Sequence, residues 1–141
     1  RRVLFRSDWN SIESVTKKEF TESDIMLAKF GTAVISDVKS NAILLVSTTK
    51  TGFATVGVGP GQTSRVEAVR IAARRAGDRA KGSMMISDAF FPFRDGIDTA
   101  NEIGVESIVQ PGGSMRDSDS ISAADEHDMS MIFTNRRLFL H

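Results

Sequence analysis

The stretch "NAILLVSTTKTGFATVGVGPGQTSR" (residues 41–65) determines most of the fold that the sequence predicts. Its first part, 41–47, is typical of a short buried strand, "TTKTG" of a turn, and "FATVGVG" (53–59) of the return strand of a hairpin. The segment "GPGQTS" ends this pattern, and Ser64 opens a capping box for an Ala-rich helix at about 65–79. The sheet therefore begins with an antiparallel hairpin that leads directly into a helix.

The segments on either side of this stretch complete an α/β pattern. Upstream, Thr21 and Asp24 form a capping box with Asp in place of the usual Glu, and apolar residues at helical spacing then predict a helix at about 22–36. Downstream, strands are expected at 83–87, 105–110 and 129–134, with helices at 95–103 and roughly 117–127. Strands joined by helices require right-handed crossovers and lie parallel. We expect a three-layer α/β/α fold with helices on both faces of a mixed, mostly parallel five-stranded sheet.

Composition excludes several classes of function. A chain of 141 residues fits one domain, and its net charge of zero gives no overall attraction to nucleic acid or to an anionic membrane. Apolar runs such as "AILLV" are far shorter than the roughly 20 residues of a membrane-spanning helix. The absence of Cys fits a cytoplasmic protein, and two His without Cys make a zinc site improbable. We expect no nucleic acid, membrane or zinc partner.

The first seven residues, "RRVLFRS", have an unusual possible origin. One DNA spelling of them, AGACGTGTGCTCTTCCGATCT, is a common sequencing-library adapter. We interpret residues 1–7 as non-native and adapter-derived, and residues 8–141 as a C-terminal fragment of a longer protein. The alternative is a natural basic arm that docks on the core, and a full-length gene from the same source encoding "RRVLFRS" would support it.

Four segments follow strands at the edge where open α/β sheets bind ligands: "GPGQTSR", "DAFFPFRD", "PGGSMRD" and "NRRLFLH". In the first, read with the end of the strand before it as "GVGPGQTSR" (57–65), Gly57, Gly59 and Gly61 are expected to let the backbone approach a ligand closely, because they lack Cβ. The helix N-terminus behind them favours an anion or a carbonyl oxygen, and the residues delivered there are Gln62, Ser64 and Arg65. A tight turn with a helix cap explains this segment equally well. For "PGGS" (111–114), a strand-to-helix turn is the simpler explanation.

The "DAFFPFRD" segment is expected to be rigid, because Pro92 fixes its own φ and biases Phe91 away from helical geometry. One or two of its Phe rings are expected to cap the core, and another to stack on a planar heteroaromatic ligand. Asp88 could accept hydrogen bonds or bind a cation. Asp95 could pair with a ring N–H, cap the following helix, or do both.

The tail contributes a possible phosphate clamp. The forked guanidinium of Arg137 matches the geometry of a phosphate. The usual interpretation of such a residue is a solvated surface Arg, and this is our interpretation of its neighbour Arg136. The apolar "LFL" before His141 indicates that the tail docks. His127, next to acidic residues near a helix end, is interpreted as a surface residue.

In this order, "VKSNAI", "GVGPGQTSR", "SDAFFPFRDGID", "VQPGGSMRDSDSI" and "FTNRRLFLH" resemble the C-terminal half of the AICAR transformylase domain of bifunctional purine biosynthesis proteins. The resemblance extends from about Asp8 to His141. That family transfers a formyl group from 10-formyltetrahydrofolate to the 5-amino group of AICAR in purine biosynthesis. Its transformylase region consists of two cytidine deaminase-like subdomains without the zinc ligands of true deaminases, and this chain resembles the second. The resemblance also implies an upstream subdomain as partner and a homodimer whose active sites form across the interface.

The resemblance implies a role for particular residues. Asn41 is similar to the Asn that holds the carboxamide and amine of AICAR in the reactive arrangement. Further residues of the nucleotide site would be Arg65, Phe90 beside the base, and Arg137 at the phosphate, and from its place at the helix N-terminus we also expect Gln62 to bind substrate. Residues of the folate pocket would be Asp95 and the backbone of Gly112, Gly113 and Ser114. Asp88 and the region of His141 resemble a structural site for a monovalent cation such as K⁺.

No residue of this chain is a convincing general base for the transfer. In the family that role belongs to a Lys-His pair in the preceding subdomain, and no "KH" dipeptide occurs here. Three hypotheses follow: a formyltransferase fragment that needs its upstream half, a non-catalytic nucleotide- or folate-binding module, or a dimerisation unit. An upstream Lys-His motif would favour the first, binding without turnover the second, and dimerisation without binding the third.

Overall fold

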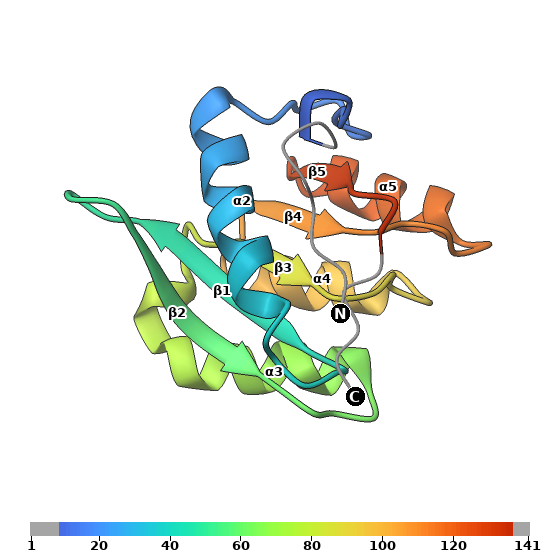
Figure 1. Cartoon of the computed structure of the whole chain (residues 1–141). Coiled ribbons are helices and arrows are strands. Elements are labelled where there is room, and N and C mark those ends of the chain that lie inside the picture. Colours follow the sequence, from blue (N-terminus) through green and yellow to red (C-terminus); the bar gives the residue numbers. More distant parts are fainter. Residues whose placement is uncertain (1–8, 137–141) are drawn as a thin grey trace.

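A five-stranded sheet in the order β2-β1-β3-β4-β5 forms the centre of the computed structural model, which describes residues 9–136 (Figure 1). Its strands are β1 (Ile43–Thr48), β2 (Phe53–Gly59), β3 (Met84–Ser87), β4 (Ser107–Gln110) and β5 (Ser130–Phe133). β1 is antiparallel to both of its neighbours, whereas β3, β4 and β5 are parallel to one another. All strands except β1 therefore run in one direction, which confirms the predicted mixed, mostly parallel sheet.

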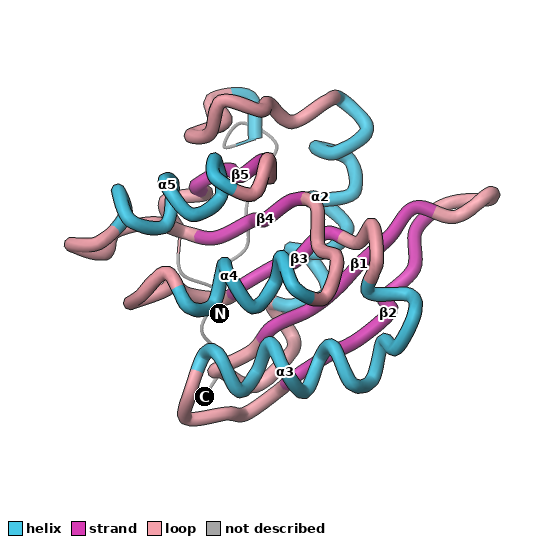
Figure 2. The backbone as a smooth tube through the Cα atoms, turned by 180° about the vertical axis from the view of Figure 1, so that it is seen from behind, coloured by secondary structure: helices cyan, strands magenta, loops and turns pink. Residues whose placement is uncertain are grey.

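Helices cover both faces of this sheet, as predicted. The helices are α2 (Glu22–Ile35), α3 (Arg65–Ala76), α4 (Asp95–Glu102) and α5 (Asp117–Glu126), with a 3₁₀ turn η1 (Gly77–Ala80) after α3. α2 packs on one face, and Figure 2 shows α3, α4 and α5 side by side on the other. The described residues thus form three layers, α/β/α.

The strands separate two cores because successive side chains point to opposite faces. In β1, Ile43 and Leu45 belong to the core beneath α3, α4 and α5, whereas Leu44 and Val46 belong to the core beneath α2. Burial on both faces explains why β1 begins with a continuous apolar run, whereas the edge strand β2 is partly exposed and mixes apolar residues with Thr and Gly.

The helix starts agree closely with the capping signals. At α2, Thr21 Oγ1 accepts from the Asp24 N–H at 3.1 Å and the Asp24 carboxylate accepts from the Thr21 N–H at 2.9 Å, so the predicted capping box is confirmed. At α3, Ser64 is the N-cap and its Oγ accepts from the N–H of Glu67 at 3.4 Å, but the predicted box of Ser64 and Glu67 is only half formed, because the Glu67 carboxylate pairs with Arg70 and Arg74 instead. The α-helix then ends at Ala76, earlier than the predicted 79, because the chain tightens into η1.

The glycines of "GVG" correct one expectation. A Cβ at Gly57 would lie 2.2 Å from the carbonyl oxygen of Ala72, and one at Gly59 would lie 2.1 Å from that of Ala68. Both glycines therefore let α3 pack closely on β2, and they do not serve the approach of a ligand. Gly61, with φ of +63°, fits the predicted turn.

Two further expectations concern the chain as a whole. None of the helices within residues 9–136 combines the length and apolar character needed to cross a membrane. Residues 1–7, which we interpret as adapter-derived, lie outside the described residues, so this interpretation stays a prediction.

Candidate functional site

The predicted loops meet at one edge of the sheet. Ile43, the first residue of β1, pairs with the last residue of β2, Gly59, and with the last residue of β3, Ser87. Because β4 and β5 run parallel to β3, their carboxyl ends lie at the same edge. The residues before β1 and the segments after the other four strands therefore converge there, as the sequence indicated.

Asn41, Arg65 and Asp88 form a polar cluster at this edge. Arg65 Nη1 donates to Asp88 Oδ1 and, at 3.2 Å, to the carbonyl oxygen of Ala42. Arg65 Nη2 donates to Asn41 Oδ1 at 3.0 Å. The second carboxylate oxygen of Asp88 accepts from the N–H of Ala42 at 3.2 Å. Three sequence-predicted site residues from three separate segments are thus in direct contact.

The loop between β2 and α3 supports this cluster through its backbone. The N–H of Asn41 donates to the carbonyl of Gln62, and the N–H of Gln62 donates back to the carbonyl of Asn41, both at 3.1 Å. Asn41 Nδ2 donates to the carbonyl of Thr63 at 3.2 Å. The side chain of Gln62 turns back to the carbonyl of Pro60 at 2.9 Å. Gln62 thus holds Asn41 with its main chain, and a direct role of its amide toward a ligand stays a prediction.

The Phe residues of the aromatic loop have different environments. Phe91 is 1% exposed, and its ring lies so close to Gly96 that a Cβ there would be 2.3 Å from it. This confirms that a ring of the loop completes the core. Phe93 is 56% exposed, and the guanidinium carbon of Arg116 lies 5.4 Å from the centre of its ring. Phe90 is half-buried, and its predicted place beside the base stays a prediction.

Asp95 is the first residue of α4, directly after this loop. Its Oδ1 accepts from the N–H of Gly96 at 2.9 Å. The N-cap position belongs to Arg94, whose side chain makes no cap hydrogen bond. Asp95 therefore satisfies one N–H of the first turn without being the N-cap, and its predicted contact with folate stays a prediction.

The "PGGS" loop is a tight turn that Asp117 closes. Gly112 and Gly113 have φ of +72° and +99°, which only glycine adopts easily. The carboxylate of Asp117 accepts from the N–H groups of Gly113 and Ser114 at 2.8 and 3.1 Å. These two N–H groups are therefore engaged by Asp117, and the predicted contact of this backbone with folate stays a prediction.

The same loop contacts the start of the tail. The N–H of Asn135 donates to the carbonyl of Pro111 at 3.0 Å, and a hollow of about 180 Å³ is lined by Pro111, Gly112, Gly113 and Asn135. The predicted phosphate-binding Arg137 and the cation-site His141 lie outside the described residues. Both roles stay predictions, as does the cation role of Asp88, whose two oxygens already accept hydrogen bonds from Arg65 and Ala42. Within residues 9–136 no group of three His, Cys, Asp or Glu side chains is arranged to hold a metal ion.

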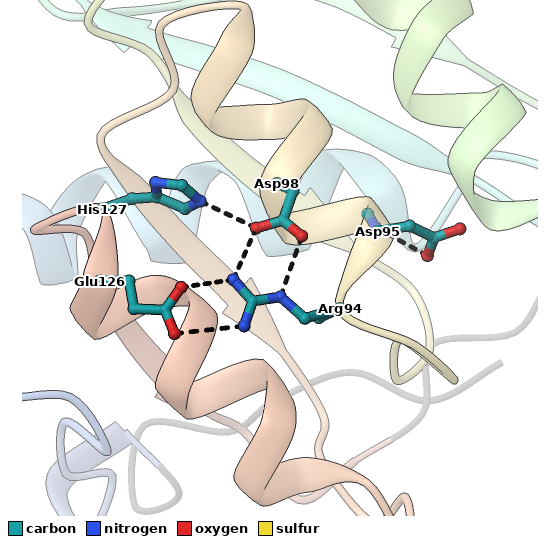
Figure 3. Close-up of polar contacts among 6 residues, drawn as sticks. Arg94, Asp95, Asp98, Glu126 and His127 are labelled. Carbon is teal, nitrogen blue, oxygen red and sulfur yellow. Dashed lines mark hydrogen bonds and ion pairs between the residues drawn. The ribbon is translucent and has the colours of Figure 1, made fainter.

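One ionic network was missed by the sequence reasoning (Figure 3). Arg94 donates to both oxygens of Asp98, at 3.0 and 3.1 Å, and to both oxygens of Glu126, at 3.3 and 2.6 Å. His127 Nε2 lies 2.8 Å from Asp98 Oδ1. The network joins the start of α4 to the end of α5, and Figure 3 shows the carboxylate of Asp95 pointing away from it. His127 is therefore part of a helix-to-helix contact. The spacing of Arg94 and Asp98 by four residues was the available signal.

The network shifts the acidity of its members. Hydrogen bonds from Arg94 hold the pKa values of Asp98 and Glu126 below their ordinary 3.8 and 4.5. The hydrogen bonds of Arg94 with Glu126 and then Asp98 raise its own pKa above the ordinary value. All of these groups are partly exposed, so the network ties α4 to α5 with only modest energy.

The fold and the arrangement of the loops define a class of protein: an α/β unit whose loops converge at the carboxyl edge of its sheet, where open α/β sheets bind ligands. Comparison with known families specifies it further, because the model of the AICARFT/IMPCHase bienzyme family matches residues 3–75. The chain belongs to that family.

Two curated relatives give the extent of the similarity. The chain is 46% identical over 134 residues to the bifunctional purine biosynthesis protein PurH of Shouchella clausii (strain KSM-K16), an alignment that covers 95% of the chain and 25% of the relative. It is 45% identical over 147 residues to the protein of the same name from Elusimicrobium minutum (strain Pei191), with 100% and 27% covered. The chain thus spans about a quarter of the length of these relatives.

Proposed function

We propose that this chain is the second, cytidine deaminase-like half of an AICAR transformylase domain that acts in purine biosynthesis. In this proposal the full domain transfers a formyl group from 10-formyltetrahydrofolate to the 5-amino group of AICAR. The observation that carries the proposal is the cluster of Asn41, Arg65 and Asp88 at the edge of the sheet, beside the aromatic loop and the "PGGS" loop. Family membership supports it.

The chemistry of formyl transfer fits such a site. The amine of AICAR is aromatic and lies next to a carboxamide, so it is a poor nucleophile that must be oriented and must lose its proton as it attacks. Arg65 and Asn41 supply positioned N–H groups, which suit the carboxamide or the oxygen of a tetrahedral intermediate. The proton acceptor would come from the Lys-His pair that the resemblance places in the preceding subdomain. The chain on its own would then bind substrate without turning it over.

Titration of the whole chain with AICAR in a calorimeter tests the binding part of the proposal. Saturable binding is expected, and Arg137→Ala should weaken it by about 1.5–3 kcal/mol because a charge-assisted phosphate contact is lost. Arg136→Ala is the matched control, since it removes the neighbouring Arg and should bind as the unaltered chain does. A folded chain that does not bind AICAR, or equal losses in both variants, would contradict the assigned clamp.

A chimera tests the catalytic part. The corresponding quarter of the Shouchella clausii protein is replaced by this chain, and formyl transfer from 10-formyltetrahydrofolate to AICAR is measured. We expect the chimera to transfer the formyl group and Asn41→Ala to abolish this activity. Glu67→Gln, the matched control on an exposed side chain, should leave the activity unaltered. A folded chimera that binds AICAR but transfers no formyl group would favour the non-catalytic binding module instead.

A further inference from the structure

We infer that Asp88 is a positioning residue: it fixes the guanidinium of Arg65 and, through it, the amide of Asn41, so that the cluster presents N–H donors to the ligand. This inference rests on the proposed function. It adds whether the ligand group that binds to the cluster is a hydrogen-bond donor or an acceptor. Asp88 would act through Arg65 and not by contact with the substrate.

Because Asp88 is buried, its carboxylate depends on the ion pair with Arg65. The side chain of Asp88 is 0% exposed and that of Arg65 is 8% exposed. Such a buried charge is tolerated only when it is paired and hydrogen-bonded, and both oxygens of Asp88 accept hydrogen bonds, from Arg65 and from the Ala42 N–H. A guanidinium held in this way has little freedom to rotate.

The planar fork of Arg65 passes this constraint to Asn41. Nη1 is committed to Asp88 and to the carbonyl of Ala42, which leaves Nη2 directed at Asn41 Oδ1, 3.0 Å away. The guanidinium can only donate, so the atom of Asn41 that it meets must be the amide oxygen. On the other side, the carbonyl of Thr63 can only accept, so the atom that meets it at 3.2 Å must be Nδ2. Two independent neighbours thus impose the same orientation on the amide.

The orientation determines what the cluster offers. Asn41 Oδ1 and both oxygens of Asp88 each accept one hydrogen bond within the described residues, which engages the acceptors of the cluster, whereas several of its donors have no partner. The N–H groups without a partner there are Nε and one hydrogen of Nη2 in Arg65, and one hydrogen of Nδ2 in Asn41. For these N–H groups the complementary ligand group is a hydrogen-bond acceptor. In AICAR that group is the carbonyl oxygen of the carboxamide.

Analogues of AICAR test this polarity on the unaltered chain. An analogue with a carboxylate in place of the carboxamide keeps the acceptor and should bind at least as tightly. An analogue with hydrogen at that position leaves the site's donors unpaired and should bind about tenfold or more weakly. A carboxylate analogue that binds as weakly as the hydrogen analogue would overturn the donor assignment.

A double-mutant cycle tests the positioning role. Asp88→Asn and Arg65→Gln should each weaken AICAR binding about tenfold, and the double variant should be no weaker than either single variant because both act through one guanidinium. The double variant also removes the unpaired buried charge, so it provides a folded sample if a single variant is unstable. Additive losses, or an Asp88→Asn variant that binds like the unaltered chain, would overturn the role.

A ligand-free measurement separates this inference from the proposed function. In NMR spectra of the chain, the two Nδ2 protons of Asn41 should differ in shift and exchange slowly, and Asp88→Asn should speed their exchange. Glu67→Gln, which changes an exposed carboxylate on α3, should leave them unaltered. If AICAR binds neither to this chain nor to the chimera but the Asn41 signals respond to Asp88→Asn, the proposed function fails and the positioning role stands. Signals that are indifferent to Asp88→Asn overturn the positioning role.

Discussion

Replacement of Gly59 by Ala tests whether the packing of α3 on β2 holds the site together. A Cβ at this position would lie 2.1 Å from the carbonyl oxygen of Ala68 and 2.9 Å from its carbonyl carbon. The atoms that it meets belong to the helix backbone, so no side chain can rotate away. To restore ordinary contact, α3 must move away from the strand by roughly 1 Å, as in other overpacked cores.

The expected cost follows from this displacement. Overpacking typically costs 1–3 kcal/mol, and we expect the upper part, about 2–3 kcal/mol, because the whole helix must shift. For a chain of this size, each kcal/mol lowers the melting temperature by about 3 °C, so a decrease of about 6–9 °C is expected. Because α3 begins at Arg65, the same shift should also weaken AICAR binding.

Thermal unfolding followed by circular dichroism measures this effect. Gly52→Ala in the hairpin turn is the matched control, since a Cβ there would meet no atom within 4 Å, and it should change stability by less than about 0.5 kcal/mol. If Gly59→Ala melts within a degree of Gly52→Ala, the glycine does not serve helix packing and the original expectation of ligand approach regains support.

Two further predictions concern the aromatic loop and the ionic network. Phe91→Ala should lower the free energy of urea unfolding by about 3–5 kcal/mol, because it leaves a cavity in the core. Phe93→Ala, which changes an exposed ring, should lower it by less than about 1 kcal/mol, and similar losses in both variants would contradict the assigned burial. Arg94 lowers the pKa values of Asp98 and Glu126 in the folded chain. The ion pairs therefore stabilise the folded state fully above the ordinary pKa values of 3.8 and 4.5, and this stabilisation is lost as the pH falls through the lowered values. Unfolding of Arg94→Gln should therefore differ from that of the unaltered chain at pH 7 and converge with it near pH 2, and a difference that persists in acid would contradict this linkage.

Local signals in the sequence were sufficient for most elements of the fold. The capping box at Thr21 and the N-cap at Ser64 gave the starts of α2 and α3 because caps satisfy N–H groups that the helix itself leaves unpaired. The hairpin strand "FATVGVG" was predicted with its observed bounds. The ends of the other strands differ from the prediction by one or two residues: β1 begins two residues later and ends one later, β3 and β4 begin one and two residues later, and β5 is one residue shorter at each end. At those ends pairing depends on neighbouring strands and not on local preference.

The role of Gly57 and Gly59 could not be predicted in the same way. A glycine permits a close approach, but the sequence does not say what approaches, and here it is α3 and not a ligand. The network of Arg94 and Glu126 has the same origin, since these residues are far apart in the chain and meet only because α4 and α5 pack side by side. Both cases depend on tertiary packing, which local patterns do not encode.

The two ionic clusters of this chain call for different explanations because their burial differs. The network of Arg94 is exposed to water, where ion pairs contribute little and serve mainly to join helices. The pair of Arg65 and Asp88 is buried, and apolar residues of similar volume would stabilise the fold as well or better. A buried pair at the ligand edge of a sheet is therefore poorly explained by stability alone. It is better explained by what it holds in place, since it fixes the guanidinium of Arg65 against Asn41 Oδ1 at the edge where the loops converge.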